Sequence, residues 1–146
     1  MSVAENFLSP EDEEEIVEAI RIAENKTSGE IRIHLEPSCG KNPLTRAKEI
    51  FHWLKMDNTK EGNGVLIYVA VKDHTFAVYG DEGINKLVPA NFWDSTKEIM
   101  QSNFKLKKFK QGLIEGVLKA GEQLQKHFPW DHKDSDNQLS DEISKG

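Results

Sequence analysis

The segment from Gly62 to Gly83 constrains the fold of this chain more than any other part of it. Val65 to Val71 is an unbroken apolar run, which predicts a strand covered on both faces by other elements. Only Lys72-Asp73-His74 separates this run from Thr75 to Tyr79, and so short a link requires an antiparallel hairpin. A glycine-flanked acidic loop over residues 80–83 completes the segment.

A helix, a strand and a second helix are expected before this segment. Ser9-Pro10, followed by acidic residues, is a helix start, and the apolar spacing carries that helix to about Asn25. Glu30 to Glu36 alternates between apolar and polar residues, which predicts a half-exposed strand. Its solvent-facing side chains would be Arg32, His34 and Glu36. Asn42-Pro43 begins the second helix, which fades at Met56.

The order of these elements predicts an α/β fold with a small mixed sheet, sandwiched by helices. A helix between the first two strands makes them a parallel pair with a right-handed crossover, and the hairpin adds an antiparallel strand. Residues 91–103 and 108–128 form the C-terminal helices. Because glycines recur in the last of them, we expect it to lie close against the sheet. These glycines are Gly112, Gly116 and Gly121. We assign residues 1–129 to one domain and residues 130–146 to an acidic, flexible tail.

Composition narrows the functional classes. A chain of 146 residues with 37% hydrophobic residues can bury one core. Its net charge of −6 argues against nucleic acid and anionic membranes as partners, but it suits divalent cations. The single cysteine, Cys39, forms no internal disulfide. The N-terminus does not resemble a secretory signal, and the longest apolar run is far shorter than a membrane span of roughly 20 residues. We therefore expect a cytoplasmic protein.

Acidic residues are expected to gather at one end of the sheet. The predicted topology brings Glu30, Asn63 and Asp81-Glu82 to that end, and Asp94 opens the next helix nearby. Oxygen ligands from several loops are what Ca²⁺ or Mg²⁺ requires, so Glu30, Asp81, Glu82 and Asp94 are the candidate metal ligands. The alternative is that the glycines only form turns and that the carboxylates are solvated or cap helices.

Other chemistry-bearing patterns do not fit known signatures. Six residues separate Cys39 from Arg46, whereas the loop of cysteine phosphatases has five. The histidines lack zinc-ligand spacing. Asp73 belongs to the hairpin turn, where an aspartate is favoured for its bonds to nearby backbone. No catalytic residue can be assigned from these patterns.

Six short motifs occur in order along the chain: residues 27–31, 63–67, 78–84, 88–94, 109–113 and 127–129. Together they resemble the TPM domain family over roughly Phe7 to Pro129. The resemblance implies a helix–sheet–helix sandwich. It also implies two possible properties, because some members are associated with divalent-metal binding and acid phosphatase activity.

Three functions are compatible with these observations. The first is a divalent-cation-binding TPM-like domain with an interaction or regulatory role, since no catalytic signature is present. The alternative, implied by the resemblance, is a metal-assisted acid phosphatase acting on phosphomonoesters. In the third, the acidic tail and Trp130 recruit a protein partner.

Overall fold

The computed structural model describes residues 7–130 and 143–145. The helices are α2 (Pro10–Glu24), α3 (Pro43–Trp53), α4 (Glu82–Asn85), α5 (Asp94–Lys105) and α6 (Phe109–Gln125). The strands are β1 (Glu30–Glu36), β2 (Gly64–Ala70), β3 (Thr75–Gly80) and β4 (Ser144–Lys145). None of the helices in these residues has the length and apolar character of a membrane span.

The sheet has the expected mixed topology. Its strand order is β3-β2-β1-β4, with β1 and β2 parallel and β2 and β3 antiparallel. Glu30 lies beside Gly64 in the parallel pair, and Val65 lies beside Gly80 in the hairpin. The start of β1, the start of β2 and the end of β3 therefore share one end of the sheet.

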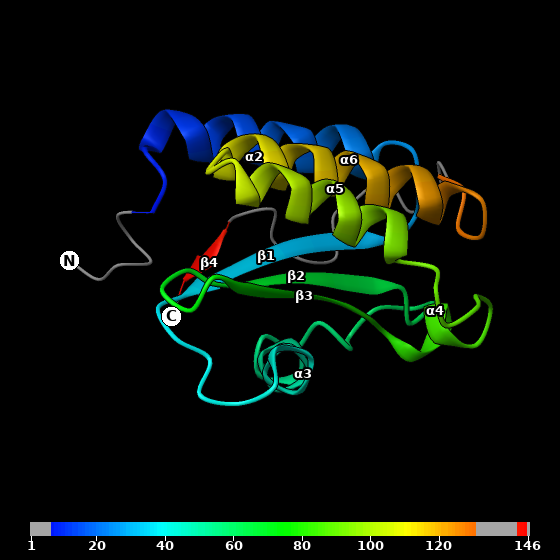
Figure 1. Cartoon of the computed structure of the whole chain (residues 1–146). Helices are drawn as coiled ribbons and strands as arrows, with labels where there is room; N and C mark the ends of the chain where they lie inside the picture. Colours follow the sequence, from blue (N-terminus) through cyan, green and yellow to red (C-terminus); the bar gives the residue numbers. More distant parts are fainter. Residues whose placement is uncertain (1–6, 131–142, 146) are drawn as a thin grey trace.

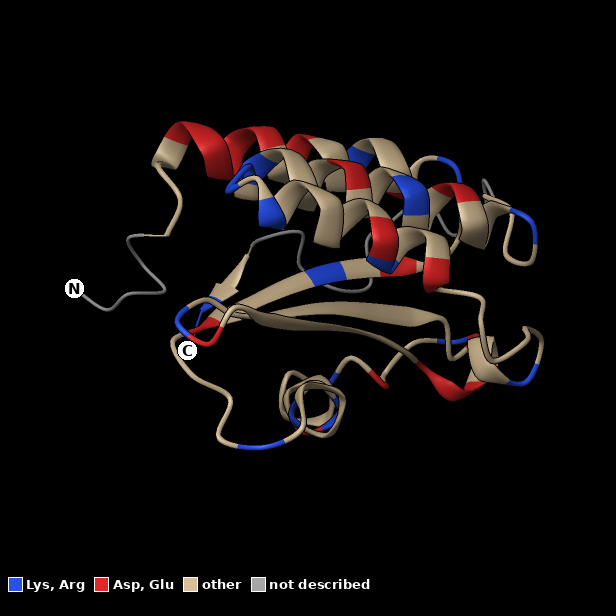
Figure 2. Ribbon diagram, viewed as in Figure 1, with Lys and Arg blue, Asp and Glu red and all other residues tan. Residues whose placement is uncertain are grey.

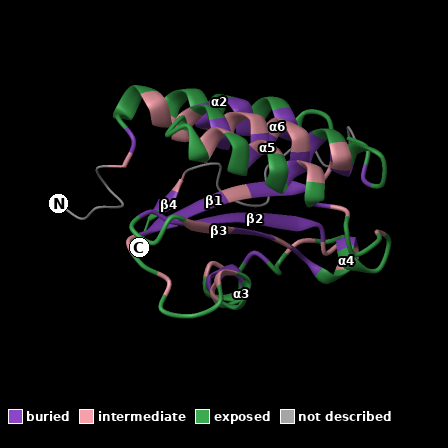
Figure 3. Ribbon diagram, in the orientation of Figure 1, coloured by how far each residue is buried: buried purple, intermediate pink, exposed green. Residues whose placement is uncertain are grey.

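Helices cover both faces of this sheet, which confirms the predicted sandwich. Helices α2, α5 and α6 lie on one face and α3 on the other (Figure 1). All seven residues of β2 are buried, as the unbroken apolar run predicted (Figure 3). Ile67 and the residues two positions before and after it pack with α2 and α6. Leu66 and Tyr68 point to the opposite face and pack with α3. The central strand thus supplies a side chain to each core at alternate positions.

Two helix starts follow the local sequence as expected. The hydroxyl of Ser9 accepts a bond from the Asp12 amide at 3.1 Å, and the Asp12 carboxylate accepts one from the Ser9 amide at 3.4 Å. The side chain of Asn42 accepts bonds from the amides of Leu44 and Thr45 at 2.9 and 3.3 Å. Each cap satisfies amides that the helix leaves unpaired, so these helices begin where the sequence places them.

Helix α6 lies on one face of the sheet, but its glycines approach the neighbouring helices α5 and α2 and not the strands. A Cβ atom on Gly112 or Gly116 would lie 2.6 Å from Phe104 or Met100 of α5. A Cβ atom on Gly121 would lie 2.6 Å from the Ala23 Cβ of α2. The missing side chains therefore let α6 pack between its two neighbouring helices.

All of β1 except the half-buried Arg32 is buried, which corrects the prediction of a half-exposed strand. His34 and Glu36 are only 1% and 5% exposed. Arg46 of α3 holds Glu36 through Nε at 2.9 Å and Nη2 at 3.0 Å, and the Tyr68 hydroxyl also donates to this carboxylate. These partners lie on different elements, so the alternating pattern of β1 alone does not reveal them.

Histidine 34 links this cluster to the C-terminal strand. Its Nε2 lies 3.3 Å from Glu36 Oε1, and its Nδ1 lies 2.9 Å from the Ser144 hydroxyl of β4. Burial lowers the pKa of His34, although its bond to Glu36 opposes the shift. Because a carboxylate only accepts hydrogen bonds, the neutral imidazole carries its proton on Nε2 and accepts from Ser144 on Nδ1.

The expected tail falls largely outside the described residues, namely at 131–142 and 146. Ser144 and Lys145 form β4, which pairs in parallel with His34 and Leu35 of β1. Lys145 Nζ also lies 2.5 Å from Glu13 Oε1 of α2. The sequence did not predict this short strand.

Two substitutions in α6 test the helix packing. Gly121→Ala should lower the free energy of unfolding by about 1–3 kcal/mol, because the new methyl group meets the Ala23 backbone, which cannot move aside. Gly116→Ala should cost less, because its methyl group meets only the side chain of Met100 and no backbone, while both variants gain the same helix propensity of about 1 kcal/mol. Urea unfolding of both variants measures the difference. Equal destabilisation would contradict this account.

The buried carboxylate makes stability depend on pH. Burial raises the pKa of Glu36, but hydrogen bonds from Arg46, Tyr68 and His34 outweigh burial and hold it below its usual value of 4.5. Glu36→Gln should therefore lower the free energy of unfolding by about 2 kcal/mol at neutral pH. This difference in stability should shrink as the pH falls below 4.5 and through the lowered pKa of Glu36. The wild-type carboxyl is then protonated, so its side chain is neutral like that of the glutamine variant.

Urea unfolding at a series of pH values measures this deficit. Glu49→Gln is the matched control, because Glu49 contacts the same arginine at 3.4 Å but is exposed. It should leave stability nearly unchanged. A Glu36→Gln deficit that stays constant down to acidic pH would show that the ionised carboxylate is not what stabilises the cluster.

Candidate functional site

The loops at one end of the sheet bring two acidic segments together. The Glu30 amide bonds to the Asn63 carbonyl at 3.4 Å, and the Asp81 amide bonds to the Gly64 carbonyl at 3.0 Å. These bonds continue the β1–β2 and β2–β3 pairings by one residue beyond the strand ends. As a result, the segment before β2 lies beside the segment after β3.

Aspartate 81 is fixed at the start of α4. Its Oδ1 accepts a bond from the Glu82 amide at 2.8 Å, and the residue is buried although its neighbour Glu82 is exposed. Only one of its two carboxylate oxygens is used in this cap. The other, Oδ2, lies 3.8 Å from the position that a Cβ atom on Gly62 would occupy.

Glycines allow the two loops to approach each other closely. Gly62 has a φ of 61°, in the left-handed region that glycine adopts without strain. A Cβ atom on Gly83 would lie 2.1 Å from the Glu61 carbonyl oxygen and 2.5 Å from that of Gly62. The backbone carbonyls of one loop therefore lie against the other loop, next to Asp81.

These loops enclose a surface pocket of about 460 Å³, which we call the acidic pocket. Its acidic side chains are Asp57, Glu61, Asp81 and Glu82. Figure 2 shows acidic segments where β3 runs into α4. Tyr79 lies among these groups, and its pKa is raised first by burial and then by Asp81, Glu82 and Asp57. Negative charge on these carboxylates therefore disfavours the ionised form of Tyr79.

Partners within the protein already occupy part of this acidic set. His52 Nδ1 lies 3.0 Å from Asp57 Oδ2. Glu61 Oε2 accepts bonds from the Ser28 hydroxyl at 2.6 Å and from the side-chain Nδ2 of Asn63 at 3.0 Å. Within residues 7–130 and 143–145, no three His, Cys, Asp or Glu side chains form a cluster that could ligate a metal. Any cation held here would complete its shell with backbone carbonyls and water.

Two of the four predicted ligands lie away from the acidic pocket. Glu30 is buried at the start of β1 and does not line the pocket. Asp94 begins α5 with a side chain 59% exposed, and its Oδ1 lies 3.7 Å from Lys97 Nζ. Asp81 and Glu82 do line the pocket. The structure thus brings together half of the set and places the rest elsewhere.

Sequence reasoning missed Asp57 and Glu61, which lie in the connection between α3 and β2. Their signal was the occurrence of two acidic residues in the short polar connection that ends at Gly62. Lys48 and Lys86 also line the pocket and were not placed there. Asp73 lies at the hairpin and has a structural use, but its Oδ2 accepts a bond from the distant Cys39 amide at 2.8 Å and not from the backbone of its own turn.

Comparisons with known proteins identify the fold. The family model described as TPM domain matches residues 1–123. The NMR structure of BA42 protein from the psychrophilic bacterium Bizionia argentinensis is 55% identical, with a TM-score of 0.91 over 100% of both chains. A comparison with curated proteins found no match.

Two more distant structures share the fold. The N-terminal domain of a protein from P. gingivalis is 22% identical, with a TM-score of 0.69 over 86% of this chain and 83% of that one. The N-terminal domain of cg2496 protein from Corynebacterium glutamicum is 12% identical, with a TM-score of 0.63 over 91% and 79%. The chain, matched by the family model over most of its length, belongs to the TPM domain family.

Proposed function

We propose that this TPM domain binds a divalent cation, Mg²⁺ or Ca²⁺, in the acidic pocket through Asp81 and Glu82. The observation that carries the proposal is that the carboxylates of Asp57, Glu61, Asp81 and Glu82 line one pocket. A cation would neutralise charges that the loop glycines hold close together. Glu30 and Asp94 have no part in this site.

The donor set suits a cation that keeps part of its water. Mg²⁺ is commonly held by one or two carboxylates and several waters, and Ca²⁺ also accepts backbone carbonyls. Asp81 Oδ2 is directed toward Gly62, and the Glu61 and Gly62 carbonyls lie beside Gly83. Asp57 and Glu61 would add charge, and one oxygen of each already bonds to a neighbour, Asp57 Oδ2 to His52 and Glu61 Oε2 to Ser28 and Asn63.

Such a cation would act on the fold and on its surface. It would tie the loop before β2 to the loop after β3, and binding to the folded state stabilises that state. It would also replace a negative patch by a bound ion at the molecular surface. Both effects suit an interaction or regulatory role.

A second candidate function is a metal-assisted phosphatase acting on phosphomonoesters. Lys48 and Lys86 line the acidic pocket, and neither forms an ion pair with a described residue. Lysine ammonium groups contact phosphate as point charges, which supplies the clamp that no residue next to Asp81 in sequence provides. A bound cation would polarise the phosphoryl oxygen and activate water.

An NMR titration tests cation binding. Adding Mg²⁺ or Ca²⁺ at neutral pH should shift the amide signals of residues 61–63 and 81–83. Asp81→Asn should weaken the affinity about tenfold, equivalent to roughly 1.4 kcal/mol, because the cation loses a charged ligand. Asp94→Asn is the control and should leave the affinity unchanged. If millimolar cation moves none of these amides, this site does not exist.

A phosphomonoester assay tests the second candidate. Purified protein with Mg²⁺ should hydrolyse p-nitrophenyl phosphate, and Asp81→Asn or Lys86→Gln should each lower the rate about a hundredfold through lost electrostatic stabilisation. Lys126→Gln, at the C-terminal end of α6 and outside the pocket, is the matched control. Hydrolysis that survives Asp81→Asn would point to a contaminant. Cation binding without hydrolysis would reject the phosphatase and retain cation binding as the proposed function.

A further inference from the structure

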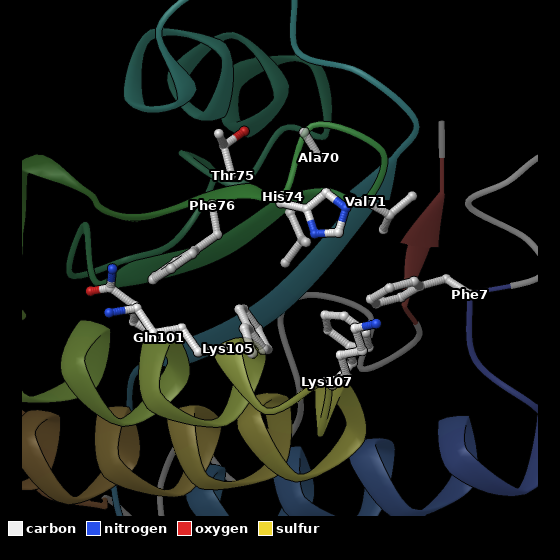
Figure 4. Close-up of a pocket in the computed structure, with 12 residues that line it drawn as sticks. Phe7, Ala70, Val71, His74, Thr75, Phe76, Gln101, Lys105 and Lys107 are labelled. Carbon is white, nitrogen blue, oxygen red and sulfur yellow. The ribbon is translucent and has the colours of Figure 1, made fainter.

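A second pocket lies at the opposite end of the sheet, where β2 leads into β3. It has a volume of about 330 Å³, and we call it the apolar pocket. The residues that line it are Phe7, Val69, Ala70, Val71, His74, Thr75, Phe76, Gln101, Phe104, Lys105, Lys107 and Phe109. It lies between the hairpin turn and the junction of α5 with α6 (Figure 4). Neither the acidic pocket nor the predicted metal site includes any of these residues.

Phenylalanine rings form the wall of the apolar pocket. The Phe76 and Phe104 centroids are 5.4 Å apart, those of Phe104 and Phe109 are 5.7 Å apart, and those of Phe109 and Phe7 are 4.7 Å apart. All four rings are only half buried, whereas Phe51 in the other core is fully buried. A continuous aromatic surface left open to solvent is typical of a binding site.

The rim of the apolar pocket is cationic. Lys105 and Lys107 lie on the rim, and neither forms an ion pair with a described residue. His74 is directed toward the middle of the site in Figure 4. None of the described residues that line the pocket is acidic, although the whole chain has a net charge of −6. The charge of the rim is therefore opposite to that of the molecule.

Backbone conformation places two of these basic residues. Lys107 has a φ of 60° and His74 a φ of 57°, so both occupy the left-handed region that non-glycine residues adopt rarely. Lys107 turns the chain between α5 and α6, and His74 turns it between β2 and β3. Two tight turns thus present basic side chains across the same aromatic surface.

We propose that the apolar pocket binds a small amphipathic carboxylate, with its alkyl or aryl tail against the phenylalanine rings and its carboxylate at Lys105 and Lys107. The volume lies at the lower end of the range for small-molecule sites, roughly 300–1,000 Å³. Apolar burial supplies most of the affinity, and the two ammonium groups select an anion over a neutral ligand. The Gln101 amide on the rim adds a hydrogen-bond donor.

Octanoate and octanol are a matched pair of probes, because they share a chain length and differ in charge. In an NMR titration of the whole chain, octanoate should produce saturable shifts at residues 69–76 and 104–109. Octanol should shift the same amides with a weaker affinity. The double variant Lys105→Gln/Lys107→Gln should weaken octanoate binding roughly fivefold, as expected for two exposed ion pairs, and leave octanol binding unchanged.

Two further variants distinguish the contribution of the lysine charges to binding from that of the pocket itself. Gln101→Trp adds an indole at an exposed lining position, so it should fill the pocket and weaken both probes about tenfold without touching the core. Lys126→Gln removes one positive charge at the far end of α6 and should change neither affinity. Amide spectra that match the wild type away from the substituted residues verify that each variant is folded.

Several results would overturn the proposal. These are an absence of saturable shifts, shifts that map outside the apolar pocket, or equal octanoate and octanol affinities that the double lysine variant does not change. Concentration-dependent shifts of the same amides without any probe would assign this face to a second copy of the chain instead. Each outcome is independent of the cation site, because the two pockets share no residue.

Discussion

The complete burial of β2 is the constraint on which the rest of the structure depends. Its residues point alternately to two cores, so helices must cover both faces of the sheet. The crossover helix α3 covers one face, which leaves α2, α5 and α6 to cover the other (Figure 1). With its faces covered by helices, the sheet carries the acidic pocket and the apolar pocket at its two ends, where the loops lie.

The α3 face combines an apolar core with a buried charge. An ionised carboxylate away from water is costly unless it is paired and fully hydrogen-bonded. Glu36 meets that requirement with Arg46 of α3, Tyr68 of β2 and His34 of β1, and His34 in turn reaches Ser144 of β4. Three elements, β1, β2 and α3, therefore meet at the Glu36 carboxylate, and His34 connects β4 to them.

Local patterns determined the parts of the fold that a sequence can reveal. The apolar run of β2, the short hairpin link and the caps at Ser9 and Asn42 each act within a few residues, and all were predicted correctly. The burial of Glu36, the helix partners of Gly121 and the strand at Ser144 were not predicted. Each of these depends on a contact between separate elements, for which a single sequence gives no distance.

The candidate site divides in the same way. Topology alone placed Asp81 and Glu82 at the correct end of the sheet, because strand direction fixes which loops meet. Topology did not show that Glu30 lies outside the pocket, because it does not reveal that this residue is buried at the start of β1. It also did not predict that Asp57 lines the pocket, because the loop that contains Asp57 has no periodic pattern. Side-chain direction within a loop depends on local dihedral angles, and neither spacing nor alternation reports those.

The hairpin explains why the two ends of the sheet differ so much in character. Because β2 and β3 are antiparallel, the acidic loop after β3 lies beside the start of β2, while the turn at His74 lies at the other end with the lysines of the α5–α6 junction. The seven residues of β2 separate the ends by roughly 23 Å at 3.3 Å per residue. Over that distance, through a close-packed core, the effects of substitutions generally add. The two ends can therefore carry different ligands within one small domain without one site constraining the chemistry of the other.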